Sequence, residues 1–173
     1  MVKKFPLMLG KKCNDRDSVA WMPPKPGWLK LNFNGASKGN PGASGIGCVV
    51  RDHNGLFKGK MALSIALDTN NIAEFKALLL GLLEFSSRGI KHVVVEGDLA
   101  IAINAVKTIR LPNWRLQALL ERILKELSRF DDFSCKHVYR EANLEADALS
   151  KIATDGTNLS WWADEFKVTY PSD

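Results

Sequence analysis

The sequence lacks the features that would assign it to a secreted or membrane-spanning class. Its three cysteines, Cys13, Cys48 and Cys135, are odd in number and far apart, so they predict free thiols in a reducing compartment and no disulfide framework. The longest strongly apolar run, residues 77–83, is too short to cross a bilayer, and residues 1–13 lack the hydrophobic core of a signal peptide. We therefore expect a soluble intracellular protein, nuclear or cytoplasmic, with no membrane partner.

The charge bias of the sequence is small. Its 173 residues include 24 Lys and Arg against 19 Asp and Glu, which gives a formal net charge of +5 and a pI near 9.2. This excess favours a polyanionic partner such as nucleic acid, although a charge of this size often serves only solubility. With 46% hydrophobic residues, the chain is long enough to bury the core of one globular domain, which we expect to be monomeric.

Turn signals and hydrophobic periodicity divide the chain into three parts. We expect a basic and then proline-rich extension over 1–27, a single domain over 28–155, and a C-terminal tail over 156–173. Within the domain, apolar runs predict strands, and apolar residues at helical spacing predict helices. The expected strands are 28–34, 45–52, 56–64, 91–96 and 133–139, and the expected helices are 71–87, 98–106, 114–130 and 141–152.

This order of elements predicts an α/β fold. Residues 52–55 form a turn signal, Asp-His-Asn-Gly, so the first three strands are expected to form an antiparallel meander. The alternation of strands and helices after it favours a five-stranded mixed sheet with helices on both faces. At the ends of its central strands, side chains from distant parts of the chain can converge.

Three carboxylates and one amide are the candidates for that convergence. Glu74, Asp98, Asp147 and Asn34 each lie in a short stretch beside a different predicted element. Hard divalent cations such as Mg²⁺ prefer oxygen ligands, so the three acids indicate a metal site. Asn34 offers a carbonyl oxygen but no charge.

Taken singly, each acid has a simpler structural explanation. Glu74 stands three residues after Asn71, which is the spacing of a capping box. Asp98 follows a predicted strand, where it could cap the next helix. Asp147 is harder to explain in this way, because Asp is a poor residue inside a helix. It lies four residues after Asn143, so the two share a helix face.

Four motifs resemble those of a known family. They are Asn34-Gly-Ala-Ser-Lys-Gly-Asn-Pro-Gly42 with Gly45-x-Gly47, Thr69-Asn-Asn-Ile-Ala-Glu74, Glu96-Gly-Asp98, and Arg140-Glu-Ala-Asn143-x-x-x-Asp147. In this order they resemble type 1 ribonuclease H, and more narrowly the plant ribonuclease H-like domains related to retrotransposon reverse transcriptases. The resemblance covers residues 21–154 and implies a ribonuclease H-like fold. It favours an ancestral active site over separate structural roles for the three acids.

The resemblance also implies a reaction, hydrolysis of the RNA strand of an RNA/DNA hybrid with two Mg²⁺ ions or Mn²⁺. Asn34, at the position of a family Asp, together with Glu74, Asp98 and Asp147 would be the catalytic and metal-binding residues. Two dications about 3.5 to 4 Å apart repel by roughly 17 kcal/mol at an effective dielectric of about 20. Because Asn34 brings no charge, we expect weak metal pairing and cleavage that is absent or severely reduced. An Asn-Gly pair also deamidates readily, so aged protein is expected to contain some Asp at position 34.

The same resemblance assigns contacts to the nucleic acid. Small polar side chains and close backbone amides can meet the 2′-hydroxyls of a hybrid minor groove. The assigned residues are Gly35, Ala36, Ser37, Lys38, Thr69, Asn70, Asn71, Arg140 and Asn143. For Ser, Asn and Gly at these positions, ordinary turn chemistry is an equally good explanation. Basic residues over 107–129 could form a phosphate track, and Trp114 is expected to be a core or edge anchor rather than a base-stacking platform.

Two classes of function remain open from the sequence. The chain is either a hydrolase of RNA in hybrids, feebly active or with Asn34 introduced to trap substrate, or a noncatalytic module that keeps the nucleic-acid contacts after losing one ligand. Both predict binding of hybrid duplexes that weakens steeply with salt. A third reading is a protein-interaction domain that uses Trp161 and Trp162 for docking, although such a pair more often packs back onto its own domain.

Overall fold

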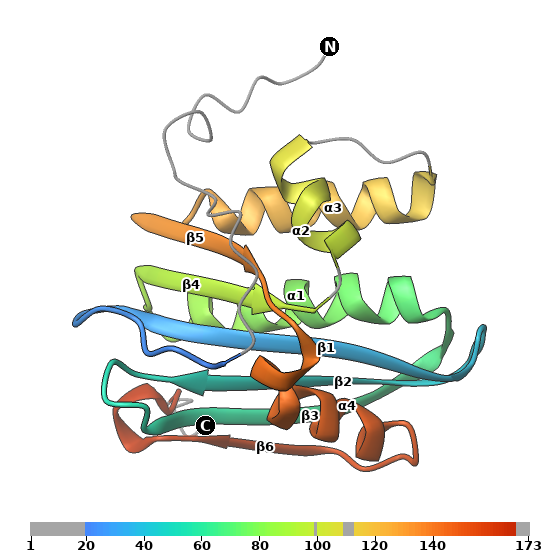
Figure 1. Ribbon diagram of the computed structural model, residues 1–173, viewed down its shortest axis with the longest axis horizontal. Coiled ribbons are helices and arrows are strands. Elements are labelled where there is room, and N and C mark those ends of the chain that lie inside the picture. Colours follow the sequence, from blue (N-terminus) through green and yellow to red (C-terminus); the bar gives the residue numbers. More distant parts are fainter. Residues whose placement is uncertain (1–19, 99, 109–112, 169–173) are drawn as a thin grey trace, which may run out of the picture.

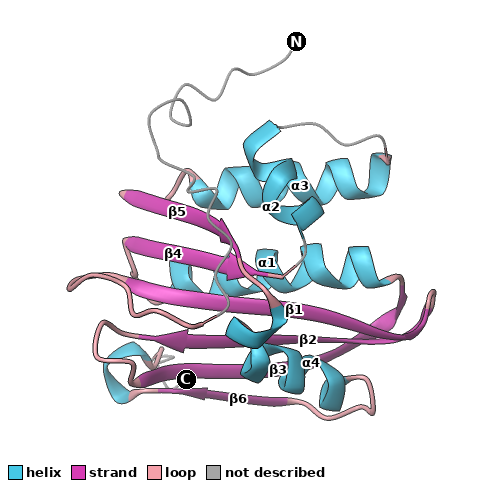
Figure 2. Cartoon of the chain, in the orientation of Figure 1, coloured by secondary structure: helices cyan, strands magenta, loops and turns pink. Residues whose placement is uncertain are grey.

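The computed structural model describes residues 20–98, 100–108 and 113–168. They form one mixed sheet of six strands in the order β5-β4-β1-β2-β3-β6, with helices on both faces (Figures 1 and 2). The strands are β1 (Leu29–Gly39), β2 (Gly42–Arg51), β3 (Phe57–Asp68), β4 (His92–Gly97), β5 (Asp132–His137) and β6 (Leu159–Trp162). The helices are α1 (Asn70–Ser87), α2 (Ala100–Thr108), α3 (Trp114–Leu127) and α4 (Leu144–Ala153), with short 3₁₀ turns η1 (Arg140–Ala142) and η2 (Asp164–Phe166).

The pairing of the strands confirms the predicted mixed sheet. β1 pairs antiparallel with β2, and β2 with β3, whereas β4 runs parallel to both β1 and β5. The number of strands was predicted wrongly, because a sixth strand, β6, pairs antiparallel with the outer edge of β3. The strands β1 and β3 also continue beyond their predicted ends, so the hairpins are longer than the apolar patterns indicated.

The two faces of the sheet are covered by different helices. Figure 1 shows α1, α2 and α3 on one side of the sheet and α4 on the other. The main core lies on the α1 side, where Leu31, Phe33 and Ile46 are fully buried. Burying a side chain of this kind stabilises the fold by about 1.5 to 3 kcal/mol. In β2, residues that alternate with this core face meet α4 instead, as expected from the two-residue period of a strand.

Helix starts differ from those predicted, and the differences bear on the acids. The side chain of Thr69 caps α1 by accepting a hydrogen bond from Ile72 N at 3.3 Å, so Glu74 lies beyond the capping positions. The helix predicted over 141–152 begins at Leu144, because residues 140–142 form η1 first. Because Thr69 is the cap and Glu74 lies five residues after it, the capping explanation is wrong for Glu74. The cap predicted at Asp98 adjoins residue 99, which lies outside the described residues.

Described residues on both sides of the predicted domain contribute to it. Trp21, in the predicted extension, donates from Nε1 to Asn32 Oδ1 at 3.0 Å. The predicted tail supplies β6, so the sheet continues past residue 155, where we expected the domain to end. Trp162 is 7% exposed and packs against Phe85 and under the Arg88 guanidinium, whereas Trp161 is 48% exposed. Because Trp162 is buried, the pair cannot dock a partner together. In the described part of the chain, no helix has both the length and the apolar character needed to cross a bilayer.

The two adjacent tryptophans give a matched test of this extended boundary. Trp162→Ala should lower the free energy of unfolding by about 3 to 5 kcal/mol, because it empties a packed site. Trp161→Ala should lower it by about 0.5 kcal/mol or less, since most surface substitutions have effects of that size. Urea unfolding of both variants measures the difference. Equal and small effects would mean that residues 159–162 lie outside the cooperative domain.

Candidate functional site

Glycines in the sheet allow two helices to touch its backbone. A Cβ at Gly35 in β1 would lie 2.2 Å from the backbone nitrogen of Glu74 in α1. On the other face, a Cβ at Gly47 in β2 would lie 2.3 Å from the carbonyl oxygen of Ala146 in α4. Neither contact is possible for a larger residue. This close approach brings Glu74 and Asp147 up to Asn34, which lies on β1 between the two helices.

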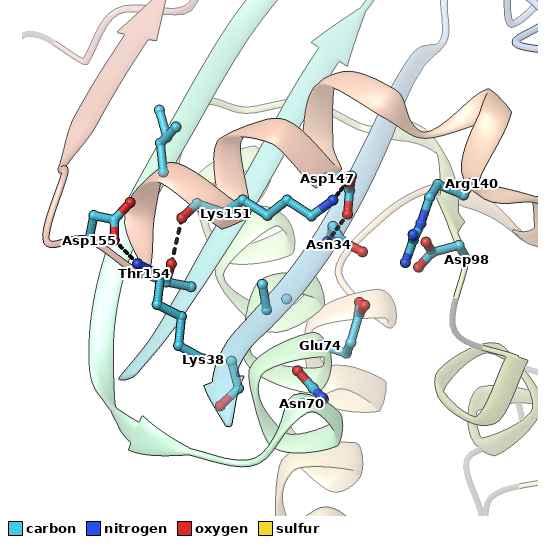
Figure 3. Close-up of a pocket in the computed structure, with 14 residues that line it drawn as sticks. Asn34, Lys38, Asn70, Glu74, Asp98, Arg140, Asp147, Lys151, Thr154 and Asp155 are labelled. Carbon is cyan, nitrogen blue, oxygen red and sulfur yellow. Dashed lines mark hydrogen bonds and ion pairs between the residues drawn. The ribbon is translucent and has the colours of Figure 1, made fainter. Parts of the chain in front are cut away.

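A cleft of about 700 Å³ opens over this point. All four predicted catalytic positions line it, and Figure 3 shows Asn34, Glu74, Asp98 and Asp147 converging from β1, α1, the end of β4 and α4. Most of the predicted nucleic-acid contacts line the same cleft. These are Gly35, Ala36, Ser37, Lys38, Asn70 and Arg140.

Three predicted contact residues do not line the cleft. Asn143 is 1% exposed; its Nδ2 donates to Phe33 O at 2.9 Å and its Oδ1 accepts from Asn32 Nδ2 at 3.1 Å. It ties the start of α4 to β1, and a contact from its buried side chain to nucleic acid stays a prediction. Thr69 is engaged as the cap of α1, and Asn71 is exposed outside the lining. Contacts from Thr69 and Asn71 stay predictions.

The buried Asn34 side chain is the centre of the acidic cluster. In the orientation drawn in Figure 3, its nitrogen donates to Ser150 Oγ at 2.7 Å and to Asp147 Oδ1 at 3.3 Å. Its oxygen then faces the acceptors of Glu74 and Asp98. The swapped orientation gives both atoms a partner. The nitrogen donates to Glu74 Oε1 at 2.9 Å and Asp98 Oδ1 at 3.0 Å, and the oxygen accepts from Ser150 Oγ, whose single hydrogen otherwise goes to Asp147 O at 2.7 Å. We adopt the swapped orientation. In either one, the amide nitrogen donates to carboxylates of the cluster.

Basic side chains stand beside two of the acids. Lys151 Nζ lies 2.6 Å from Asp147 Oδ2, one helical turn further along α4. Figure 3 shows the Arg140 side chain next to the Asp98 carboxylate. Lys38, across the cleft, pairs with Asp155. Two of the three acids on the floor of the cleft, Asp98 and Asp147, therefore have a basic side chain beside them, and Glu74 has none among the described residues.

Burial and mutual repulsion disfavour charge on this floor. Burial, followed by the charges of Asp98 and Asp147, raises the pKa of Glu74 well above its ordinary value. Burial also raises the pKa of Asp98, and the nearby Arg140 charge opposes that rise. One oxygen, Glu74 Oε2, is buried without a hydrogen-bond partner.

The predicted centre of two Mg²⁺ ions does not match this donor set. Carboxylate oxygens suit Mg²⁺, and the unpartnered Glu74 Oε2 favours a cation on its own side of the cluster. However, the Asn34 nitrogen points at carboxylates, and the Lys151 ammonium holds Asp147. Among the residues the structure describes, no group of three or more His, Cys, Asp or Glu side chains is placed to hold a metal ion. The residues present do not fit two cations.

Several residues of the cleft were missed by sequence reasoning. Lys151, Ile152, Thr154 and Asp155 line it, and Ser150 is buried beneath. The spacing of Asp147 and Lys151, four residues apart on a helix, was the one signal available for an ion pair. Trp114 does not pack as expected, since it is 79% exposed. Lys107 and Arg110 of the predicted basic track lie outside the side chains that the structure describes.

The raised pKa of Glu74 predicts how stability depends on pH. The folded protein holds the Glu74 proton more tightly than the unfolded chain, so this residue makes the protein less stable as pH rises above about 4.5. Glu74→Gln cannot ionise. Its free energy of unfolding should therefore exceed that of the parent by an amount that grows from pH 4.5 to pH 8, in urea titrations with EDTA. Glu121→Gln, which removes one charge from the exposed side of α3, is the control. A difference that stays constant with pH would contradict the assignment.

Comparisons with known proteins match most of the chain. The profile of a family described as "Reverse transcriptase-like" matches residues 32–153. A protein of Arabidopsis thaliana provisionally named as a ribonuclease H is 33% identical over 135 residues, which are 78% of this chain and 22% of that protein. Ribonuclease HI of Halobacterium salinarum is 32% identical over 136 residues, which are 77% of this chain and 67% of that enzyme.

Solved structures give the same result. The crystal structure of the Halobacterium salinarum ribonuclease H1 matches with a TM-score of 0.71 and 31% identity, over 75% of this chain and 99% of that one. The ribonuclease H1 named LC11, crystallised with an RNA/DNA hybrid, matches with a TM-score of 0.68 and 26% identity, over 74% of this chain and 97% of that one.

Proposed function

The chain belongs to the type 1 ribonuclease H family, in its reverse transcriptase-like branch. From this premise we propose that it binds RNA/DNA hybrids but cleaves their RNA strand weakly or not at all. We also propose that the protein is intracellular and binds hybrids as a monomer. The observation that carries the proposal is the uncharged Asn34 side chain, which is buried at the floor of the cleft beside Glu74, Asp98 and Asp147. In the orientation adopted above, its amide donates to Glu74 and Asp98.

The rim of the cleft supports the binding half of the proposal. Ser37 and Asn70 offer small polar groups, which suit the 2′-hydroxyls of a hybrid minor groove. Lys38 and Arg140 lie on the exposed rim and can neutralise phosphates, which supplies most of the sequence-independent affinity of such complexes. An RNA/DNA hybrid offers both 2′-hydroxyls and phosphates, so it can bind the small polar groups and the basic side chains of the rim together.

The floor of the cleft supports the second part of the proposal, that cleavage of the RNA strand is impaired. Members of the ribonuclease H family depend on divalent metal ions. A pair of close cations needs carboxylate charge around it. Asn34 brings none and turns a donor toward the acids, which leaves the duplex bound over a floor that lacks the means to hydrolyse it.

Restoring one carboxylate tests the impaired half directly. With a labelled RNA/DNA hybrid and Mg²⁺ or Mn²⁺, the parent chain should give little or no scission, and Asn34→Asp should increase the rate at least about a hundredfold, since a change of about 2.7 kcal/mol in barrier has that effect. Asn34→Asp combined with Asp147→Asn should lose the gain. Peptide mass spectrometry of the parent excludes deamidated protein as a source of background. Equal scission by parent and Asn34→Asp would contradict the proposal.

A second variant tests the binding half. Arg140→Gln should weaken binding of the hybrid in EDTA, measured by fluorescence anisotropy, and should reduce the slope of log affinity against log salt by about 1, the value for one lost phosphate contact. Lys91→Gln removes the same charge from an exposed position at the opposite end of β4 and should leave the slope unchanged. Identical slopes for the two variants would remove Arg140 from the interface.

A further inference from the structure

The acidic floor of the cleft contains its own substitutes for cations. We propose that the Asn34 amide and the Lys151 ammonium take the place of divalent ions, so that this domain folds and binds hybrids without any metal. The statement about hybrids rests on the proposed function, whereas the statement about folding does not.

The need for substitutes arises from burial. The side chains of Glu74 and Asp147 are buried, and Asp98 meets them in one cleft. Carboxylates that leave water without partners are costly, and like charges at short range add to the cost. Some positive or hydrogen-donating group must offset this in the folded state.

Asn34 supplies the first substitute. In the swapped orientation its amide nitrogen donates to Glu74 Oε1 at 2.9 Å and to Asp98 Oδ1 at 3.0 Å, and such hydrogen bonds offset the burial of both carboxyl groups. In the other orientation the nitrogen still donates to Asp147, at 3.3 Å. An Asp at this position would instead place an oxygen at about the same short distances from the oxygens of Glu74 and Asp98. Asparagine therefore stabilises the metal-free cluster in a way that aspartate cannot.

Lys151 supplies the second substitute. Its ammonium lies 2.6 Å from Asp147 Oδ2, while its own side chain is 58% exposed. The ammonium can thus neutralise Asp147 at the edge of the cleft without being desolvated itself. Together the two groups reach all three acids. Glu74 Oε2 is a buried oxygen of this cluster without a hydrogen-bond partner, and a cation bound there would contradict the proposal.

Thermal unfolding in EDTA and in Mg²⁺, at matched ionic strength, tests the proposal without reference to activity. The Tm of the parent should be the same in both buffers. Asn34→Asp should melt at a lower temperature in EDTA, and Mg²⁺ at about ten times its dissociation constant should raise its Tm by about 3 to 5 °C. A rise of that size for the parent would overturn the proposal.

Lys151→Met separates the second substitute from the first. This variant keeps the aliphatic stem and removes the charge, so its Tm should fall in EDTA and recover in part with Mg²⁺. Lys167→Met is the matched control, because Lys167 pairs with Asp164 at 2.5 Å on the surface and away from the cleft. Its Tm should not respond to Mg²⁺. The same Tm response from both lysine variants would show that the Lys151 charge does not offset the charge of Asp147.

Binding of a labelled hybrid by the parent, in EDTA and in Mg²⁺, distinguishes the two proposals. Equal affinity in both buffers supports both of them. Affinity that appears only with Mg²⁺ would overturn metal independence and leave the proposed function standing. No binding in either buffer, with a Tm insensitive to Mg²⁺, would overturn the proposed function and leave the metal-free cluster standing.

Discussion

The close approach of helices to the central strands is the constraint on which the rest of the site depends. Gly35 admits the backbone of α1 to β1, and Gly47 admits that of α4 to β2. Two helices on opposite faces can then deliver Glu74 and Asp147 to the same point on β1. The geometry that assembles the acids also buries them, so the fold creates a concentration of negative charge that must be offset.

The identity of residue 34 decides how that charge is offset. With an aspartate, the cluster would depend on cations from solvent. With Asn34, the chain itself provides a donor to Glu74 and Asp98, and Lys151 provides a counter-charge to Asp147. Replacing one carboxylate oxygen of an aspartate by the amide nitrogen of Asn34 thus turns a site suited to metal into one whose acids find partners within the chain. The cleft and its rim keep the groups that suit a duplex.

Much of this arrangement could be predicted from the sequence, for identifiable reasons. The strand and helix patterns gave the mixed sheet, and the order of the motifs brought Asn34, Glu74, Asp98 and Asp147 together. What was missed depended on burial that periodicity does not encode. β6 is a four-residue strand with one buried tryptophan, so its pattern resembled a tail. Asn143 reads as an exposed polar residue but is buried against Phe33 O.

The central claim is that an amide nitrogen, and not a cation, lies between Glu74 and Asp98. A crystal structure of the parent chain grown with Mn²⁺, with anomalous data collected for manganese, tests this most directly. The claim predicts no anomalous peak in the cleft and an Asn34 side chain within hydrogen-bonding distance of both carboxylates. A manganese peak bonded to Glu74 and Asp98, with the Asn34 oxygen turned toward it, would contradict the claim.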